Sequence, residues 1–266
     1  DELFGGYNRY NWMRKMLKVP APMRSLLANG INSISPMGWD QIHRCIVPVL
    51  PKGLNLPQFG DKLHKLASVL GMKSAGEVYK RLVSSWDNPN ALVLGGHELS
   101  NLSHAWDLLS DFDSIEHRMM ALDAITYLPD DILCKVDRAA MGVSLETRIP
   151  FLDHRLVEFA WRLPLHMKIR GGQGKWVLRQ LLYKYVPKEM IERPKMGFGV
   201  PIDTWLRGPL REWAESLLDE TRIKNEGYLD PVPIRKKWNE HLSGRRNWQH
   251  QLWNVLMFQA WLESQA

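Results

Sequence analysis

The side chains best suited to chemistry in this sequence are carboxylates near a helix start and lysines near glycines. Asp130 and Asp131 follow Pro129, which suits the first position of a helix because its missing N–H is not needed there. Carboxylates in a first helical turn favour the positive end of the helix dipole, and capping is their usual role. Lys195 lies in RPKMGFGVP, where glycines let the backbone approach a ligand closely, although most loop lysines are simply exposed.

Two predicted helices would hold the acidic pair. Apolar residues recur at helical spacing from Ile132 onward and give residues 129–142 one apolar face, and Gly142 ends this helix. Asp153 is expected to cap a second helix, which Pro164 ends. The short polar turn predicted between the two helices carries Glu146, Arg148 and Asp153.

The rest of the chain is also predicted to be helical, without a convincing β-sheet. The predicted helices cover 10–17, 22–27 with a break at Gly30, 41–45, 61–70, 75–86, a helix capped by Asp111 or Ser114 that runs to residue 127, 174–185, 231–242 and 248–262. The last of these is apolar almost all round, which predicts burial on several sides.

Three separate motifs resemble the glutamine-dependent asparagine synthetase family. The strongest, DRAAMGVSLETRIPFLDHRLVEF, begins at Asp137. The opening DELFGGYNRY is similar to the end of that family's acidic nucleotide loop, and GKWVLRQLLYKYVPKEMIERPKMGFGVPIDTWL is similar to its lysine-bearing segments. The motifs occur in the family's order and cover residues 1–10 and about 127–206.

The resemblance implies a reaction and a fold. An ATP-dependent amidotransferase of this kind adenylates a carboxylate, aspartate first, and transfers glutamine-derived ammonia to it, giving asparagine, AMP and pyrophosphate. The fold would be the mainly α, C-terminal part of an ATP-pyrophosphatase-type α/β synthetase domain, with most of the parallel sheet missing. Residues 1–10 would be the tail of the nucleotide loop, 11–126 a helical insertion, 127–206 the motif region and 207–266 C-terminal helices.

The reaction requires cations for phosphate, carboxylates for Mg²⁺ and one acid near the nitrogen nucleophile. By resemblance, Lys195 is the catalytic lysine beside the α-phosphate, and Lys175 binds the pyrophosphate part of ATP. Asp1 matches the carboxylate that binds Mg²⁺. Asp131, in preference to Asp130, would be the acid at the reacting centre.

Other residues of the motifs are expected to support these. Glu2 would be structural. A hydrogen-bonded brace of helix and turn would be formed by Arg138, Glu146, Arg148 and Asp153, because arginine–carboxylate forks hold geometry well.

The sequence also departs from the family. It contains neither the glutaminase domain with its N-terminal cysteine nucleophile nor the Ser-Gly-Gly-x-Asp-Ser loop that cradles pyrophosphate. We therefore expect this chain to be a piece of a longer protein, which would be cytoplasmic and able to form a homodimer. The piece alone is expected to be inactive and to bind ATP weakly or not at all. The stretch 16–114 is longer than in compact members and resembles larger bacterial homologues, so a sugar acid or a peptide carboxylate stays an alternative acceptor.

Composition argues against several other classes. The 266 residues carry a net charge of +6, but the basic residues are spread in short groups, which favours solvated helix faces over a nucleic-acid site. No apolar run approaches the roughly 18 residues of a membrane span, and no Cys–His spacing suits a structural metal.

A catalytically silent helical interaction module is the alternative from a different class. The two hypotheses differ in whether the four predicted site residues approach one cleft: Lys195, Lys175, Asp131 and Asp1.

Overall fold

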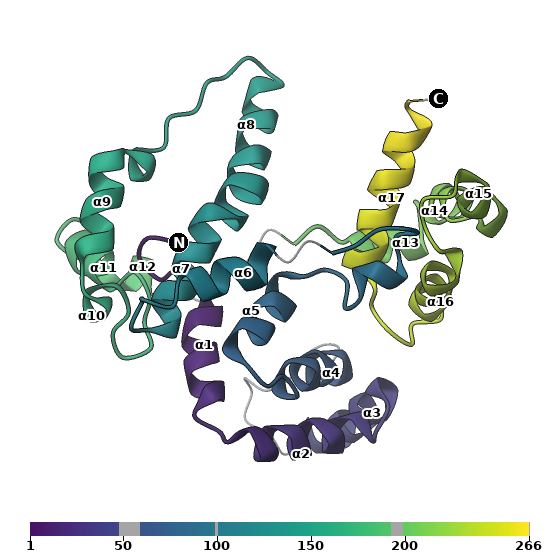
Figure 1. Ribbon diagram of the computed structural model, residues 1–266, viewed down its shortest axis with the longest axis horizontal. Coiled ribbons are helices and arrows are strands. Elements are labelled where there is room, and N and C mark those ends of the chain that lie inside the picture. Colours follow the sequence, from purple (N-terminus) through teal and green to yellow (C-terminus); the bar gives the residue numbers. More distant parts are fainter. Residues whose placement is uncertain (48–58, 99–100, 193–198, 266) are drawn as a thin grey trace. The chain divides into compact units, whose positions relative to one another are not determined.

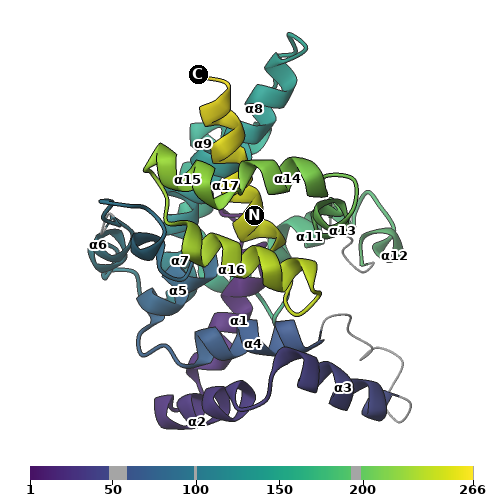
Figure 2. The same ribbon diagram turned by 90° about the vertical axis from the view of Figure 1, so that its right-hand side faces the viewer.

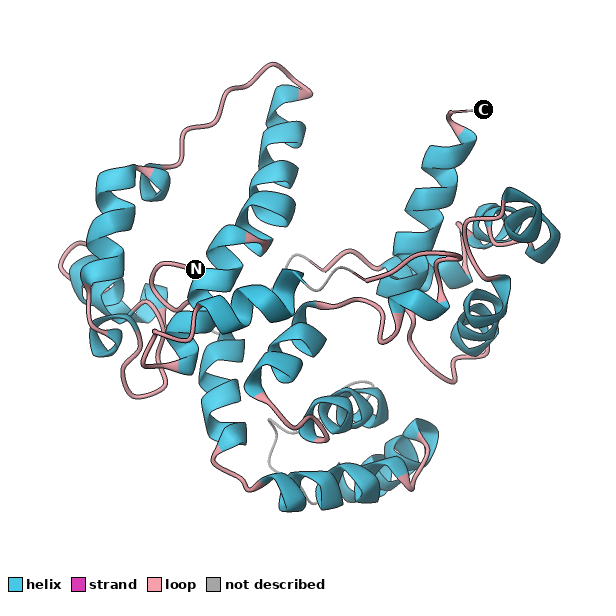
Figure 3. Ribbon diagram, viewed as in Figure 1, coloured by secondary structure: helices cyan, strands magenta, loops and turns pink. Residues whose placement is uncertain are grey.

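A computed structural model describes residues 1–47, 59–98, 101–192 and 199–265. Within these ranges the chain is mainly helical, as predicted, and Figure 3 shows helices joined by loops without a strand. Isolated β-bridges pair Val93 with Leu229 and Arg170 with Gln173. In the described part of the chain, no helix has both the length and the apolar character that crossing a membrane requires.

The chain folds as two compact units, whose helices are labelled in Figures 1 and 2. The first unit comprises residues 1–20, 74–79 and 100–196, and the second comprises 21–73, 80–99 and 197–266, so α5 (Ala75–Val83) contributes to both. The predicted four-part division of the chain stays a prediction.

The first unit contains α1 (Asn8–Leu17), α6 (Asn101–Leu108), α7 (Ile115–Ile125), a π-helical turn (Leu128–Leu133), α8 (Cys134–Met141), a 3₁₀ turn (Pro150–Leu152), α9 (His154–Arg162), α10 (Leu165–Lys168), α11 (Trp176–Leu182) and α12 (Lys188–Ile191). The second contains α2 (Ala21–Asn32), α3 (Pro36–Ile46), α4 (Phe59–Leu70), a 3₁₀ turn (Pro89–Ala91), α13 (Ile202–Arg207), α14 (Arg211–Leu217), α15 (Glu220–Glu226), α16 (Pro231–Leu242) and α17 (Gln249–Glu263).

A buried carboxylate joins α1 to α7 in the first unit. Asp123 is fully buried and accepts hydrogen bonds from the hydroxyls of Tyr10 at 2.5 Å and Tyr79 at 2.8 Å. Its charge is neutralised by Arg9, whose guanidinium lies 2.7 Å away. Burial, followed by the Asp123 charge, raises the pKa of both tyrosines, so each remains a protonated donor. Pairing and hydrogen bonding are what make a buried charge tolerable.

The predicted helix over 129–142 exists, but it does not begin at Pro129. Thr126 breaks the regular geometry at the end of α7, and the π-helical turn then leads directly into α8. Pro129 has no N–H to donate, and the N–H of Cys134 reaches back five residues to the Pro129 carbonyl. A missing donor and a five-residue hydrogen bond are the usual marks of a π turn in a helix. Gly142 follows the last helical residue, as predicted.

The expected short turn between α8 and α9 is wrong. The connection runs over residues 142–153 and is non-helical until the 3₁₀ turn, as Figure 1 shows. No residue of α8 is buried, and the connection exposes large apolar side chains, with Leu145 at 60% and Val143 at 77%. Asp153 caps α9 as predicted, because its carboxylate accepts the Arg155 N–H at 2.9 Å.

The second unit holds a large apolar core. Helices α13 to α17, grouped in Figure 2, surround Trp238, which is fully buried. The prediction that α17 is buried on several sides is wrong: Leu252 and Leu256 are buried, whereas Met257 and Trp261 are 40% and 56% exposed. The core residues contributed by these helices are Leu206, Ala214, Leu217, Ile223, Ile234, Trp238, Leu252, Val255 and Leu256.

Candidate active site

The turn before α11 lies against the opening residues of the chain. The backbone N–H of Lys175 donates to the Phe4 carbonyl at 2.8 Å. A Cβ on Gly174 would stand 2.0 Å from the Gly5 carbonyl oxygen, so only glycine permits this approach. Lys175 itself has φ +57°, in the left-handed region that non-glycine residues rarely adopt and that is often found at functional sites.

This approach brings together two of the four predicted site residues. The Lys175 Nζ lies 2.5 Å from a carboxylate oxygen of Asp1. Gly6 leaves room for the pair, since a Cβ there would overlap the Asp1 Oδ1 at 1.9 Å and the Lys175 Cε at 2.5 Å. Burial lowers the pKa of Lys175; the nearby Glu2 charge opposes this shift and the Arg179 charge adds to it. The amine is therefore easier to deprotonate than an ordinary lysine, yet is held by a carboxylate.

Two hollows of similar size flank Lys175 within the first unit. One, of about 290 Å³, has a mainly polar lining that includes two asparagines and five glycines: Asn8, Asn11, Gly5, Gly6, Gly171, Gly172 and Gly174. The other, of about 280 Å³, is bordered by Asp1 and Lys175 and is otherwise mainly apolar, with Leu128, Ile132, Phe151 and Leu178 in its wall. A polar and an apolar compartment on either side of one lysine could hold the two ends of a ligand that is charged at one end only.

A single carboxylate organises the edge of the polar hollow. Glu192 accepts hydrogen bonds from Gln173 at 3.1 Å, from the Arg179 guanidinium and from the Tyr183 hydroxyl. The Arg179 Nε also donates to the Gly174 carbonyl at 3.1 Å. These bonds fix Arg179 beside the glycine turn and place a second cation next to Lys175.

Asp131 lies on the π-helical turn that borders the apolar hollow, but it does not line that hollow. Its half-exposed carboxylate lies 3.5 Å from the Lys135 Nζ and hydrogen-bonds to Tyr127. The Tyr127 ring contacts the ring of Tyr7, whose hydroxyl donates to Glu2 at 2.7 Å. These contacts connect Asp131 through two tyrosines to Glu2, whose charge acts on Lys175.

The residues present could hold a phosphate–magnesium group without a dedicated metal cage. No group of three or more His, Cys, Asp or Glu side chains in the described ranges could hold a metal by itself. Mg²⁺ needs only one or two protein carboxylates when phosphate oxygens and waters complete its shell. Asp1 beside Lys175, Arg179 and glycine backbone fits that type of site, because cations and open N–H groups suit phosphate oxygens.

Comparison with known proteins decides the family. The family model described as asparagine synthase matches residues 1–263, almost the whole chain. The chain belongs to the asparagine synthase family. A putative glutamine-hydrolysing asparagine synthetase of Mycobacterium tuberculosis H37Rv is 40% identical over 269 residues, covering 98% of this chain and 37% of that protein. No solved structure gives a significant match.

Other relatives in the asparagine synthase family agree. Asparagine synthetase 1 of Bacillus subtilis strain 168, also named as glutamine-hydrolysing, is 26% identical over 264 residues, covering 98% of this chain and 38% of that protein. The human asparagine synthetase is 31% identical over 139 residues, covering 46% of this chain and 24% of that protein. The chain therefore spans little more than a third of the relatives that it matches along its length.

The predictions for the remaining motif residues, Lys195 and the arginine–carboxylate brace, compare differently with the structure. Lys195 lies outside the described residues, so its predicted place beside Lys175 stays a prediction. Arg148 pairs with Glu146 at 2.5 Å and Arg155 with Asp153 at 2.7 Å, all on exposed surface. The expected brace between helix and turn is wrong, because these pairs are local and Arg138 makes no ion pair within the described part of the chain.

Sequence reasoning missed Arg179, Tyr183 and Glu192. A signal did exist, because Arg179 and Tyr183 lie four residues apart and share a face of α11 and its end. Their common partner Glu192 comes after another helix, and nothing in the local pattern indicates that it folds back onto them.

Proposed function

We propose that this chain is part of an ATP-dependent amidotransferase that adenylates a carboxylate, aspartate first, and transfers glutamine-derived ammonia to it. The products are asparagine, AMP and pyrophosphate. One observation carries the proposal: the contact of Lys175 with Asp1 beside a glycine-lined polar hollow. Family membership and the names of the relatives support it. The accompanying fold is the helical part of an ATP-pyrophosphatase-type synthetase domain.

The residues divide the work by charge. Lys175 and Arg179 would bind the pyrophosphate oxygens, and Asp1 would hold Mg²⁺ against them, as the donor set permits. When bound, MgATP supplies a good leaving group to the acceptor carboxylate. Lys195 would stabilise the charge that gathers at the α-phosphorus, and Asp131 would orient or deprotonate the ammonia.

The context of the reaction follows from the same proposal. Ammonia would come from a glutaminase domain of the complete protein, which would be cytoplasmic and able to form a homodimer. We expect this chain to bind ATP weakly or not at all, because its sequence contains no Ser-Gly-Gly-x-Asp-Ser loop to cradle pyrophosphate. Calorimetric titration of the isolated chain with MgATP checks this, and micromolar affinity would contradict it.

The decisive experiment uses the full-length protein with ammonium as nitrogen donor, which removes the need for glutaminase activity. AMP release that depends on aspartate is measured for the wild type and for Lys175→Ala. We expect kcat/KM to fall about 100- to 1000-fold, the usual cost of losing one preorganised group that stabilises transition-state charge.

Lys184→Ala is the matched control, because Lys184 is an exposed lysine just beyond the same helix. It should retain wild-type activity. Retention of more than half the activity by Lys175→Ala would contradict the role given to Lys175. If no carboxylate supports AMP release, the result favours a catalytically silent helical module.

The acceptor is the part of the proposal with least support. The long segment 16–114, which resembles larger bacterial homologues, favours a sugar acid or a peptide carboxylate as the alternative to aspartate. Running the same AMP assay with each acceptor class separates them, because only the true acceptor supports saturable AMP release.

A further inference from the structure

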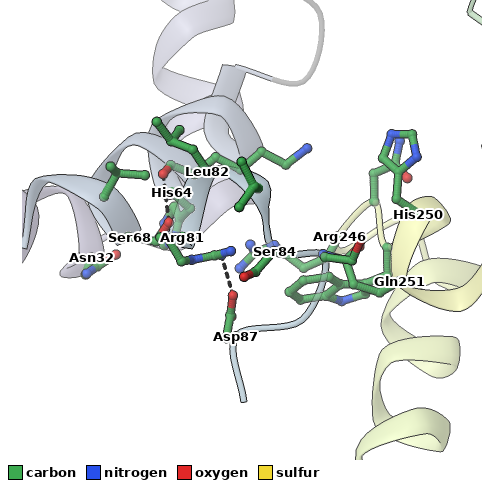
Figure 4. A pocket seen from close by; sticks show the side chains of 16 residues that line it. Asn32, His64, Ser68, Arg81, Leu82, Ser84, Asp87, Arg246, His250 and Gln251 are labelled. Atoms are coloured by element: carbon green, nitrogen blue, oxygen red, sulfur yellow. Dashed lines mark hydrogen bonds and ion pairs between the residues drawn. The ribbon is translucent and has the colours of Figure 1, made fainter. Parts of the chain in front are cut away.

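The second unit contains a pocket of about 560 Å³, a volume typical of small-molecule sites. All of its lining residues belong to that unit. They come from the end of α2, from α4, from α5 and the segment after it, and from the loop before α17 and the start of that helix. Figure 4 shows Asn32 and Ser68 on one side of the pocket and His250 and Gln251 on the other. The pocket therefore lies between elements that are far apart in the sequence.

Most charged groups in the pocket wall already have partners. Arg81 pairs with Asp87, the dashed contact in Figure 4. The Arg246 Nε lies 2.7 Å from a carboxylate oxygen of Asp61, just behind the wall. The His64 Nε2 lies 2.9 Å from the carbonyl oxygen of Ile34. The one carboxylate in the lining is thus neutralised, and these cations are not the source of an excess charge.

Lys65 and His250 are the basic side chains of the pocket wall that have neither a carboxylate nor a backbone carbonyl as partner among the described residues. Lys65, on α4, has no carboxylate within ion-pair distance among the described residues, and His250, on α17, touches only the side-chain amide of its neighbour Gln249, at 3.4 Å. Burial, and next the positive charge of Lys65, lowers the pKa of His250, so the two nitrogen bases act on each other across the pocket. Two bases that repel one another without an acid between them gain free energy when an anion enters.

Neutral donors stand beside this pair. The amides of Asn32 and Gln251 line the pocket and make no hydrogen bond within the described residues. Leu82, Val83 and Val69 supply an apolar wall. A tetrahedral oxyanion, which presents several acceptor oxygens, uses such a mixture of cationic and amide donors better than a planar carboxylate does.

We propose that this pocket binds a small organic phosphate, with the phosphoryl group at Lys65 and His250 and the organic part against Leu82 and Val83. The site takes its two nitrogen donors, the Lys65 ammonium and the His250 imidazole, from separate helices of the second unit. It requires no residue of the Asp1–Lys175 site.

The test is isothermal titration of the whole chain with AMP, glucose 6-phosphate and inorganic phosphate, with citrate as the carboxylate arm. We expect saturable one-to-one binding of at least one organic phosphate. Lys65→Glu and His250→Gln should each weaken it about tenfold or more, the usual value of a hydrogen bond to a charged group. Lys62→Glu is the matched control, since Lys62 is an exposed lysine on the same helix outside the lining, and it should bind as the wild type does.

All titrations are repeated in the Lys175→Ala chain, so that binding at the first unit is separated from binding here. Both pocket residues are exposed, and equal thermal unfolding of every variant by circular dichroism shows that the fold is kept. Affinity that is unchanged by Lys65→Glu and His250→Gln overturns the proposal. So does binding of citrate alone, or loss of all binding in Lys175→Ala.

Discussion

In one region of this chain the family motif is strong and the side chains are exposed, whereas in another the motif is almost absent and the side chains are buried. Residues 137–159 in the first unit carry the strongest family motif, yet α8 buries no side chain and Leu145 is 60% exposed. Helices α13 to α17 in the second unit carry almost no motif, yet they enclose Trp238 and Leu256 completely. A recognisable motif and a stabilising core are therefore separate properties of the sequence, because the first reflects chemistry and the second reflects apolar burial.

The largest difference is expected from deletion of one side chain in the core. Leu256→Ala removes a fully buried leucine in α17 and leaves a cavity beside Trp238 and Leu252. The free energy of unfolding should fall by about 2–5 kcal/mol. Urea unfolding followed by circular dichroism measures it. A loss below about 1 kcal/mol would show that the cluster collapses around the gap or is not the stabilising core.

A loss of folding stability of intermediate size is expected when the pH is lowered. His241 in α16 is fully buried, its Nδ1 accepts the Trp248 N–H at 3.2 Å, and burial together with the Arg207 charge lowers its pKa to about 4. The folded state binds this proton less readily than the unfolded state. Stability is therefore fully present above about pH 6.5, falls as the pH drops toward 4, and the loss is roughly 2–4 kcal/mol.

Measurement of the free energy of unfolding between pH 7 and 4 checks this slope. His241→Gln is the informative variant, because it removes the titrating group and should flatten the slope whatever its effect on stability at pH 7. An equal slope in the variant would assign the acid sensitivity to other groups.

The smallest effect is expected from the same deletion in the motif region. Leu145→Ala removes an exposed side chain, so the free energy of unfolding should change by no more than about 0.5 kcal/mol. Urea unfolding of Leu145→Ala and Leu256→Ala should be measured together. Because both variants lose the same atoms, the difference between their free energies of unfolding reports the effect of burial alone. A loss approaching that of Leu256→Ala would mean that the motif region is packed against something in solution.

The sequence predicted those parts of the fold that local hydrogen bonding determines. Asp111 or Ser114 was expected to cap α7, and Asp153 to cap α9; Ser114 and Asp153 each accept the backbone N–H that a cap should accept. Gly30 was expected to break a helix, but α2 continues through it, because packing against α4 outweighs the propensity of one glycine. Helices α13 to α15 are too short for a periodic signal and depend on the core that they surround.

The candidate site was predictable only in part. Family resemblance indicated Lys175 and Asp1, but their 2.5 Å contact depends on Gly6 and Gly174, whose small size permits two distant segments to touch. Glu192 has no local signature, because its three donors meet only after the chain folds back. Long-range placement of this kind comes from tertiary packing, which spacing along the chain does not encode.

The π-helical turn at Leu128–Leu133 has a consequence for length variation in this family segment. Each residue of an α-helix advances the side-chain direction by about 100°, and a π turn holds one residue more than the regular path needs. Removing one residue from this turn would leave an ordinary α-helical turn leading into α8. Because the turn absorbs the surplus residue, side chains beyond it, Val136 included, would keep their direction after the removal, so a one-residue difference in length can be taken up here without turning α8.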